Sequence, residues 1–222
     1  MRASGYILLG HRGSPHQAPE NTMASFHKAI EVGAAGFEFD VRRSRDGALV
    51  IIHDPRTRRP RLNVRRTAAA KLGLPLLEDV LREFRGAWLD IEIKVPGIER
   101  EVVELAKRHL DRSRYVITSF RAKSVREIKR LSPETPAGWL FKRPLLLLPR
   151  WITRAEKRGQ RPIEYLCPHH TVLTRHLSRM AKKHNLGIIT WTVNRPATLK
   201  RVRERGAQVV ITNFPDRFAR LK

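Results

Sequence analysis

Acidic residues alternate along two short apolar segments of the chain, with a spacing that could assemble a metal site. Glu38 and Asp40 are two residues apart, so on an extended strand both side chains point to the same face. Asp90 and Glu92 repeat this spacing in a second segment. Buried carboxylates are costly unless they are paired with cations or bind a metal ion, and oxygen ligands suit Mg²⁺ and Ca²⁺. The pattern predicts one divalent cation, and the alternative is an internal network of ion pairs with nearby basic side chains.

Two histidines stand at the ends of other apolar segments, where they could move protons. His11 follows a glycine at the end of the first segment, and His53 is followed directly by Asp54. Beside a metal ion, one histidine could take a proton from an attacking oxygen while the other gives a proton to a leaving alkoxide. Arg12 and Lys94, the partners in the ion-pair alternative, could help the ion to stabilise the negative charge of a phosphorane. Together these residue types suit the cleavage of a phosphodiester.

The elements that would position these residues alternate between strands and helices. Strands are predicted at 6–10, 36–41, 88–94, 115–119, 137–141, 164–168, 187–192 and 208–212, with an extra strand at 48–53. Helices are predicted at 22–32, 76–84, 99–110, 123–131, 173–184, 196–205 and 215–221. This alternation favours a parallel sheet with crossover helices. Over 222 residues it predicts an α/β fold, a single-domain (β/α)₈ TIM barrel spanning 1–222. The alternative, a doubly wound sheet, would more often carry a glycine-rich fingerprint after its first strand.

Polar and glycine residues mark several of the predicted helix ends. Asn21 is a candidate N-cap of the first helix. Gly33, Gly187 and Gly206 stand where helix C-caps are expected. In a barrel of this class the functional groups collect at the carboxyl ends of the strands, where the residues described above fall.

Two stretches interrupt the alternation of strands and helices. The stretch 55–73 has little apolar periodicity and is predicted to be a basic surface loop, with arginines at Arg56, Arg58, Arg59, Arg61, Arg65 and Arg66. The stretch 139–152 contains Leu145–Leu148 between basic residues and prolines. One interpretation of this second stretch is an ordinary barrel loop followed by a helix start. The other is an apolar patch with a cationic rim that lies on lipid headgroups.

The overall charge of the chain favours negatively charged binding partners. The chain carries 45 Lys and Arg against 21 Asp and Glu, a formal net charge of +24. Such an excess attracts phosphates, nucleic acid and anionic membrane surfaces, although it could equally be a compositional bias on solvated surfaces. The single Cys167 excludes a disulfide framework and a multi-cysteine zinc site. Since no stretch has the length of a signal peptide's apolar core or of a spanning helix, a soluble, cytoplasmic protein is expected.

An ordered set of short motifs resembles the glycerophosphodiester phosphodiesterase family from the first predicted strand to the last. The motifs are H-R-G at 11–13, P-E-N-T at 19–22, G-F-E-F-D-V at 36–41, D-G-A-L-V-I-I-H-D at 46–54, L-D-I-E-I-K at 89–94, T-S-F at 118–120, T-W-T-V-N at 190–194 and I-T-N-F-P-D at 211–216. Each motif alone is weak evidence, but the ordered set is specific. The resemblance implies a (β/α)₈ barrel that uses a divalent cation. It also implies cleavage of glycerophosphodiesters to glycerol 3-phosphate and an alcohol, a reaction of lipid and glycerol metabolism.

The resemblance also implies a role for each matching residue. His11 and His53 would be the catalytic acid–base pair. Glu38, Asp40 and Glu92 would bind the cation, either Mg²⁺ or Ca²⁺. The substrate would be held by Arg12 and Lys94 at the phosphate, by Glu20 in the pocket and by Trp191 against the glycerol side.

The chain departs from the family after the H-D pair. Members usually carry a longer insertion there that caps the site, whereas the short basic loop 54–74 takes its place in this chain. An open site with an arginine rim would admit larger or lipid-bound diesters, as in lysophospholipase D-like relatives, with possible contact to an anionic membrane surface. A second alternative is a non-enzymatic binder of anionic surfaces or nucleic acid. Nucleic acid is disfavoured because the four tryptophans are scattered along the chain. The sequence makes no prediction of the oligomeric state.

Overall fold

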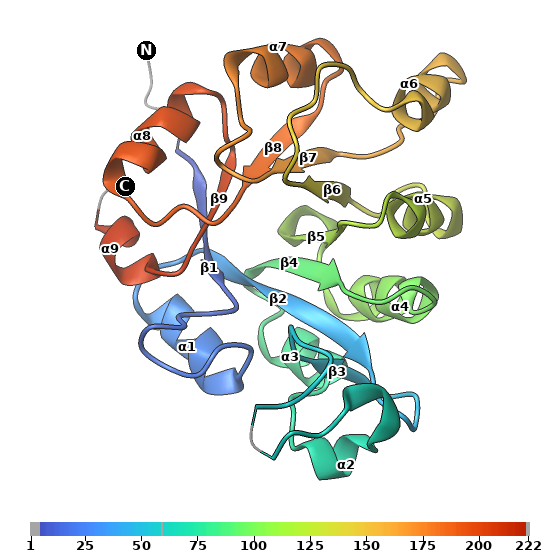
Figure 1. Ribbon diagram of the computed structural model, residues 1–222, viewed down its shortest axis with the longest axis vertical. Helices are drawn as coiled ribbons and strands as arrows, with labels where there is room; N and C mark the ends of the chain where they lie inside the picture. Colours follow the sequence, from blue (N-terminus) through green and yellow to red (C-terminus); the bar gives the residue numbers. More distant parts are fainter. Residues whose placement is uncertain (1–4, 59, 221–222) are drawn as a thin grey trace.

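Eight parallel strands close into a barrel in the computed structural model, which describes residues 5–58 and 60–220 (Figure 1). The strands pair in the order β1, β2, β4, β5, β6, β7, β8 and β9, and β9 pairs with β1 to close the ring. A ninth strand, β3, pairs antiparallel with the carboxyl end of β2. The strands are β1 (Ile7–His11), β2 (Gly36–Arg43), β3 (Leu49–Ile51), β4 (Trp88–Ile93), β5 (Tyr115–Ser119), β6 (Ala137–Phe141), β7 (Tyr165–Pro168), β8 (Gly187–Thr190) and β9 (Val209–Thr212). The predicted TIM barrel is confirmed, and the end of each predicted strand lies within two residues of its observed position.

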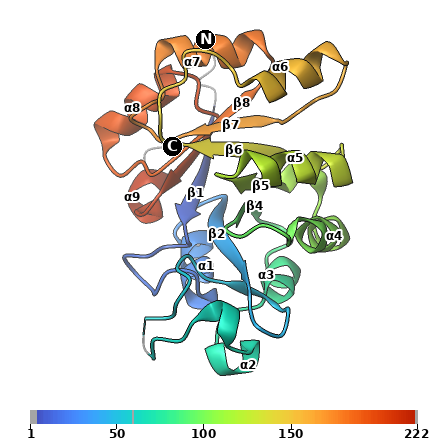
Figure 2. The same cartoon turned by 45° about the vertical axis from the view of Figure 1, so that its right-hand side comes forward.

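Helices surround the barrel and connect successive strands (Figures 1 and 2). The helices are α1 (Met23–Glu31), α2 (Ala69–Leu72), α3 (Leu77–Glu83), α4 (Glu99–His109), α5 (Ala122–Leu131), α6 (Arg150–Lys157), α7 (Arg175–Lys183), α8 (Pro196–Glu204) and α9 (Pro215–Ala219), with short 3₁₀ turns η1 (Val64–Arg66) and η2 (Arg112–Arg114). The seven predicted helices are present, and Leu221 of the last prediction lies outside the described residues. The sequence prediction missed α2 and the full extent of α6.

Two of the predicted helix caps, Asn21 and Gly187, are wrong. Thr22, and not Asn21, is the N-cap of α1: its hydroxyl accepts a hydrogen bond from the Ser25 amide at 3.2 Å. Gly33 and Gly206 follow helix ends with positive φ, as predicted. At the end of α7, however, Asn185 takes the positive φ of 52°, and Gly187 is the first residue of β8.

The alternation along the strands separates the apolar outer face from the barrel interior. Phe37 and Phe39 of β2 point outward and pack with Phe26 of α1, whose ring stacks on Phe37 with centroids 4.2 Å apart. Because neighbouring residues on a strand point to opposite faces, Glu38 and Asp40 face the interior, as predicted. A smaller apolar cluster fills the interior of the barrel, formed by Leu9, Trp88, Val116, Leu140, Cys167, Ile189, Val209 and Ile211.

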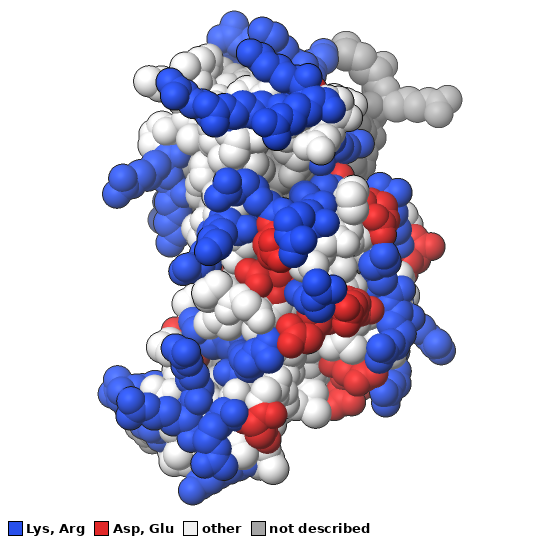
Figure 3. All heavy atoms as spheres, turned by 90° about the vertical axis from the view of Figure 1, so that its right-hand side faces the viewer, with Lys and Arg blue, Asp and Glu red and all other residues white. Residues whose placement is uncertain are grey.

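Positive charge covers much of the face that Figure 3 displays. Lys and Arg dominate at the levels of α6–α7 and of α2, while Asp and Glu gather in the band between them (Figure 3). The stretch 55–73 reaches away from the barrel around α2, as Figures 1 and 2 both show. Its Arg59 lies outside the described residues. Within the described ranges, no helix combines the length and the apolar character needed to cross a membrane.

Candidate active site

A cavity of about 260 Å³ opens at the carboxyl ends of the barrel strands. The predicted site residues that line it are His11, Arg12, Glu38, His53, Glu92, Lys94 and Trp191. Of the other two, Asp40 is buried behind this surface with 1% exposure, and Glu20 contacts Arg12. Phe120, Lys142 and His169 also line the cavity, although the sequence analysis gave none of them a role: Phe120 stood only in the T-S-F motif. The fold therefore gathers residues from most of the chain around one opening.

Strand register brings the carboxylates of two neighbouring strands together. Glu38 of β2 lies beside Asp90 of β4, and Asp40 lies beside Glu92. Glu38, Asp40 and Glu92 each offer one oxygen, and these oxygens lie within 4.8 Å of one another. All three residues are buried. The spacing inferred from the sequence thus becomes a compact set of oxygen donors inside the barrel.

Two basic side chains contact this set without neutralising it. Lys94 Nζ lies 2.8 Å from Glu92 Oε1 and 3.3 Å from Asp40 Oδ1, and Arg12 Nε lies 3.3 Å from Asp40 Oδ2. Four acidic groups, counting Asp90, thus face two cations. Among the described residues, Asp90 Oδ2 has no hydrogen-bond partner, and the contact of Asp40 Oδ1 with Lys94 Nζ lacks hydrogen-bond geometry. An unpaired buried carboxylate oxygen is unfavourable, and an all-oxygen donor set suits a hard divalent cation. These residues fit such an ion, even though the ion pairs of the alternative interpretation are also present.

Burial raises the pKa values of three acidic residues, Glu38, Asp90 and Glu92, in the absence of a cation. The pKa of Glu38 lies well above its ordinary value, because of burial and then the charges of Asp40 and Glu92. Burial and the charge of Asp40 raise the pKa of Glu92 to about 7, against the opposing effect of Lys94. Burial raises the pKa of Asp90 to about 8, although a hydrogen bond from Thr118 opposes the shift. The cation-free site therefore holds protons near neutral pH.

Protonation of these carboxyls predicts how stability changes with pH. A carboxyl with a raised pKa binds its proton more tightly in the folded protein, so stability is lost as the pH rises through that pKa. His11, with a lowered pKa, acts in the opposite sense only below about pH 6.5. We expect the melting temperature of the cation-free protein to fall between about pH 6.5 and 8.5. We also expect Mg²⁺ or Ca²⁺ to raise it more at the higher pH, because the ion binds the ionised carboxylates.

Calorimetry over this pH range, with and without the cation, measures both effects. The Glu38→Gln variant should show a shallower fall and a smaller cation-induced increase. The exposed Glu104→Gln on α4 should behave like the unchanged protein. A cation-induced increase of equal size in Glu38→Gln and in the unchanged protein would contradict the assignment of this ligand.

A tight turn after β1 carries His11 and Arg12 to the cavity. A Cβ at Gly10 would lie 2.1 Å from the carbonyl oxygen of Gly13, so only glycine allows the two backbones to approach so closely. Arg12 itself has a φ of 56°, in the left-handed region that few non-glycine residues adopt. Its amide donates a hydrogen bond to Glu38 Oε2 at 3.1 Å. The H-R-G motif thus encodes a turn that is held against the carboxylate cluster.

The two histidines are held in the same way, each through its Nδ1 atom. His11 Nδ1 lies 2.7 Å from Asn213 Oδ1, and His53 Nδ1 lies 2.8 Å from Asp54 Oδ1. Because these partners are acceptors, Nδ1 carries the hydrogen in both rings and Nε2 is left for proton transfer. The pKa of His11 is lowered to about 4, first by burial and then by the charge of Arg12, while the hydrogen bond to Asn213 opposes the shift. His11 is therefore neutral near pH 7.

Asn21, which was not predicted as a site residue, and Glu20, which was, both support the site. Asn21 donates to Asp40 Oδ2 at 2.9 Å, so the asparagine predicted as a helix cap instead holds a member of the carboxylate cluster. Glu20 Oε2 lies 3.0 Å from an Arg12 guanidinium nitrogen. The signals for these contacts are the P-E-N-T and I-T-N-F-P-D motifs, which contain Asn21 and Asn213 but do not indicate what each contacts.

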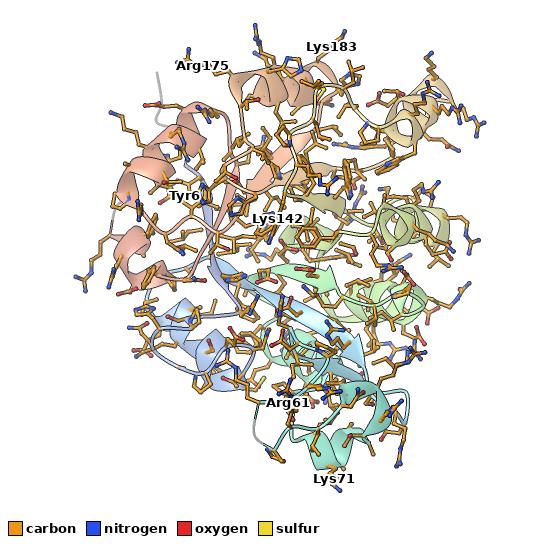
Figure 4. All side chains as sticks on the ribbon, viewed as in Figure 1. Tyr6, Arg61, Lys71, Lys142, Arg175 and Lys183 are labelled. Atoms are coloured by element: carbon orange, nitrogen blue, oxygen red, sulfur yellow. The ribbon has the colours of Figure 1, made fainter. Side chains whose placement is uncertain are left out.

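Part of the cavity wall is aromatic. Trp191 lies edge-to-face with Phe120, with ring centroids 5.3 Å apart, and with His169 at 5.1 Å. Its indole nitrogen donates to the Cys167 carbonyl at 2.9 Å, which holds the ring in place. Lys142 Nζ lies 5.2 Å from the centroid of the Trp191 ring, and Figure 4 shows this lysine over the middle of the barrel. Aromatic rings beside charged groups suit a substrate that has a carbon skeleton and a phosphate.

Comparison with known proteins agrees with this architecture. The model of the glycerophosphoryl diester phosphodiesterase family matches residues 11–67 and 60–217. The chain is 32% identical to the uncharacterized protein YqiK of Bacillus subtilis, over 96% of this chain and 97% of that protein. It is 28% identical to a glycerophosphodiester phosphodiesterase of Caldanaerobacter subterraneus subsp. tengcongensis, over 95% of each. It also superimposes with a TM-score of 0.81, at 25% identity, on a phosphodiesterase of Oleispira antarctica solved with the product sn-glycerol-3-phosphate, covering 97% of this chain and 96% of that one. From the match along nearly its whole length, the chain belongs to the glycerophosphoryl diester phosphodiesterase family.

Proposed function

We propose that the protein is a metal-dependent phosphodiesterase that hydrolyses glycerophosphodiesters to glycerol 3-phosphate and an alcohol. The observation that carries this proposal is the group of oxygen donors within 4.8 Å of one another, beside two histidines whose Nδ1 atoms are held by acceptors. Family membership and the product complex of the Oleispira relative support the reaction class and the substrate.

Glu38, Asp40 and Glu92 would hold one divalent cation, Mg²⁺ or Ca²⁺. When bound, the ion would polarise the phosphate and offset the negative charge on its oxygens as the phosphorus becomes five-coordinate. Burial and the excess of carboxyl over basic groups favour this ligand set, because a bound cation would neutralise carboxylates that otherwise must bind protons to remain buried.

His11 and His53 would transfer the protons of the reaction. One Nε2 takes the proton of the attacking oxygen, and the other gives a proton to the departing alkoxide, so the alcohol leaves neutral. Arg12 and Lys94 would hold phosphate oxygens. Burial alone would lower the pKa of Lys94, but the charges of Glu92 and Asp40 outweigh it and raise that pKa, so Lys94 stays protonated and cationic.

Glu20 and Trp191 would have supporting roles in substrate binding. Glu20 orients the Arg12 guanidinium through its 3.0 Å contact, and Trp191 with Phe120 would cover the glycerol carbons. The short basic stretch 54–74 would border an open site in place of the larger cap that relatives carry. In support, the exposed Arg58 reaches to 3.2 Å from Glu20, which in turn contacts Arg12.

The proposed function is tested by product release. Purified protein with Mg²⁺ or Ca²⁺ should release glycerol 3-phosphate from glycerophosphodiesters of choline, ethanolamine or glycerol, measured by a coupled glycerol 3-phosphate assay. It should also cleave bis-p-nitrophenyl phosphate, a generic diester. Absence of both activities in the folded, cation-loaded protein would contradict the proposal and favour a binding role for the positively charged surface.

A further inference from the structure

The loop between β6 and α6 exposes two large apolar side chains. Leu146 and Leu147 are 80% and 81% exposed, whereas Ile30, Leu76 and Phe120, the other exposed large apolar residues among those described, reach at most 40%. We call Leu146 and Leu147 the leucine tip. Exposure of two adjacent leucines is unfavourable in water, so an exposed apolar patch of this kind marks an interaction site.

The loop is built to present this tip. Leu145 and Leu148, on either side of it, pack against the core, which anchors both ends of the leucine run. The Leu146 carbonyl lies 2.8 Å from His176 Nε2 on α7, and this contact fastens the loop to the neighbouring helix. The leucine tip is thus the outward part of a fixed loop.

Basic side chains surround the leucine tip. Between residues 142 and 155 the sequence has four Lys or Arg and no acidic residue, and α7 likewise contains no Asp or Glu. Figure 4 places Arg175 and Lys183 at the two ends of α7, and Figure 3 shows Lys and Arg dominating this end of the molecule. The nearby acidic side chain of Glu156 on α6 lies 2.8 Å from His184 Nδ1, so this carboxylate is held by a hydrogen bond beside α7. Leucines within a cationic rim match the interface of an anionic bilayer, where apolar groups insert and headgroups attract cations.

The same loop reaches the catalytic opening. Lys142, at its start, lines the cavity and lies over Trp191, four residues before Leu146. Because the loop leaves the carboxyl end of β6, a surface bound at its tip would lie on the side of the barrel where the cavity opens.

We propose that the leucine tip and its basic surroundings dock on an anionic lipid bilayer, and that docking turns the cavity toward diesters held in the membrane. The positive rim argues against a second copy of this chain as the occupant, because two surfaces of like charge repel each other. The docking itself stands on the loop and its charges, and only the consequence for membrane-held substrates rests on the proposed function.

Vesicle sedimentation tests the docking without catalysis. The protein should bind vesicles of two parts phosphatidylcholine to one part phosphatidylglycerol, and should bind pure phosphatidylcholine far more weakly. Leu146→Ser with Leu147→Ser should weaken binding to the anionic vesicles on the order of 100-fold, from the loss of two inserted leucines. Arg143→Gln with Arg150→Gln should weaken it and reduce its dependence on salt.

Matched controls distinguish vesicle binding through the leucine tip from nonspecific binding through any exposed apolar or basic residue. Ile30→Ser removes a part-exposed apolar residue from α1, and Arg112→Gln with Arg126→Gln removes two exposed cations elsewhere, so both should bind as the unchanged protein does. Equal binding of the leucine variant and the unchanged protein would overturn the proposal in favour of net charge alone. Absence of vesicle binding would overturn it as well, and so would a dimer in lipid-free solution that the leucine variant abolishes.

The catalytic consequence is measured separately. The leucine variant should hydrolyse a lysophospholipid carried in anionic vesicles more slowly than the unchanged protein does. Its turnover of water-soluble glycerophosphodiesters should stay unchanged. An equal loss on both substrates would show damage to the site and overturn the link between docking and catalysis. If the protein binds vesicles but cleaves no diester at all, the docking stands and the proposed function fails.

Discussion

Replacing His11 or His53 by alanine is expected to lower kcat by about 10²–10⁴-fold, the range for a lost general acid or base. The physical reason is that each ring has its Nδ1 held by an acceptor, which leaves Nε2 as the only ring atom for proton transfer. Steady-state kinetics at saturating cation measure the effect, and circular dichroism with thermal melting confirms that each variant is folded.

The exposed His27 on α1 provides the control, because it does not line the cavity. The His27→Ala variant should therefore keep full turnover. If His11→Ala or His53→Ala lost melting temperature but kept the turnover of its folded fraction, that histidine would be structural. The choice of leaving group identifies which histidine is the acid. The variant that lacks the acid should recover on a diester whose alcohol leaves without protonation, such as p-nitrophenol.

Removal of the divalent cation is expected to cost at least about 10³-fold in kcat/KM, because a Lewis acid on a phosphoryl oxygen is worth several kcal/mol in the transition state. A chelator should therefore abolish activity, and added Mg²⁺ or Ca²⁺ should restore it. The double variant Glu38→Gln, Asp40→Asn should stay inactive at any cation concentration, since two of the three oxygen donors within 4.8 Å lose their charge.

Titration of activity with each ion, before and after chelation, checks this expectation. Glu104→Gln, an exposed acidic residue of α4, should be restored by the cation as fully as the unchanged protein. Full activity of the chelated double variant would show that the buried carboxylates serve folding through Arg12 and Lys94 alone, as in the ion-pair interpretation.

The parts of the fold that were predictable from the sequence are those that follow from local patterns. Residue alternation around Glu38 and Asp40 predicts both the strand and its inward face, because Phe37 and Phe39 need an apolar partner and α1 supplies it. The βα alternation then predicts the barrel, and the barrel brings strand ends together. The gathering of His11 and the carboxylates at one opening follows from these steps.

The parts that were missed depend on contacts between distant segments. The hydrogen bond from Asn21 to Asp40 overrides the local preference that makes asparagine a helix cap, and Thr22 takes the cap instead. Phe120 and His169 reach the cavity only because their strands end there. Helix α6 follows a loop with two prolines and has few apolar residues. The spacing of its apolar residues therefore predicts only where the helix starts, not how far it extends.

Closure of the barrel has a consequence for when the protein can first work during its synthesis. The first strand pairs with the last, and His11 receives its Nδ1 partner from Asn213, about two hundred positions later in the chain. A nascent polypeptide that already contains the proposed metal ligands and both histidines therefore still has His11 without its acceptor. Until β9 emerges from the ribosome and docks beside β1, the ring is free to rotate and to expose either nitrogen. We therefore expect the proposed catalysis to be absent from chains that end before β9 and to begin only when the ring of strands is closed.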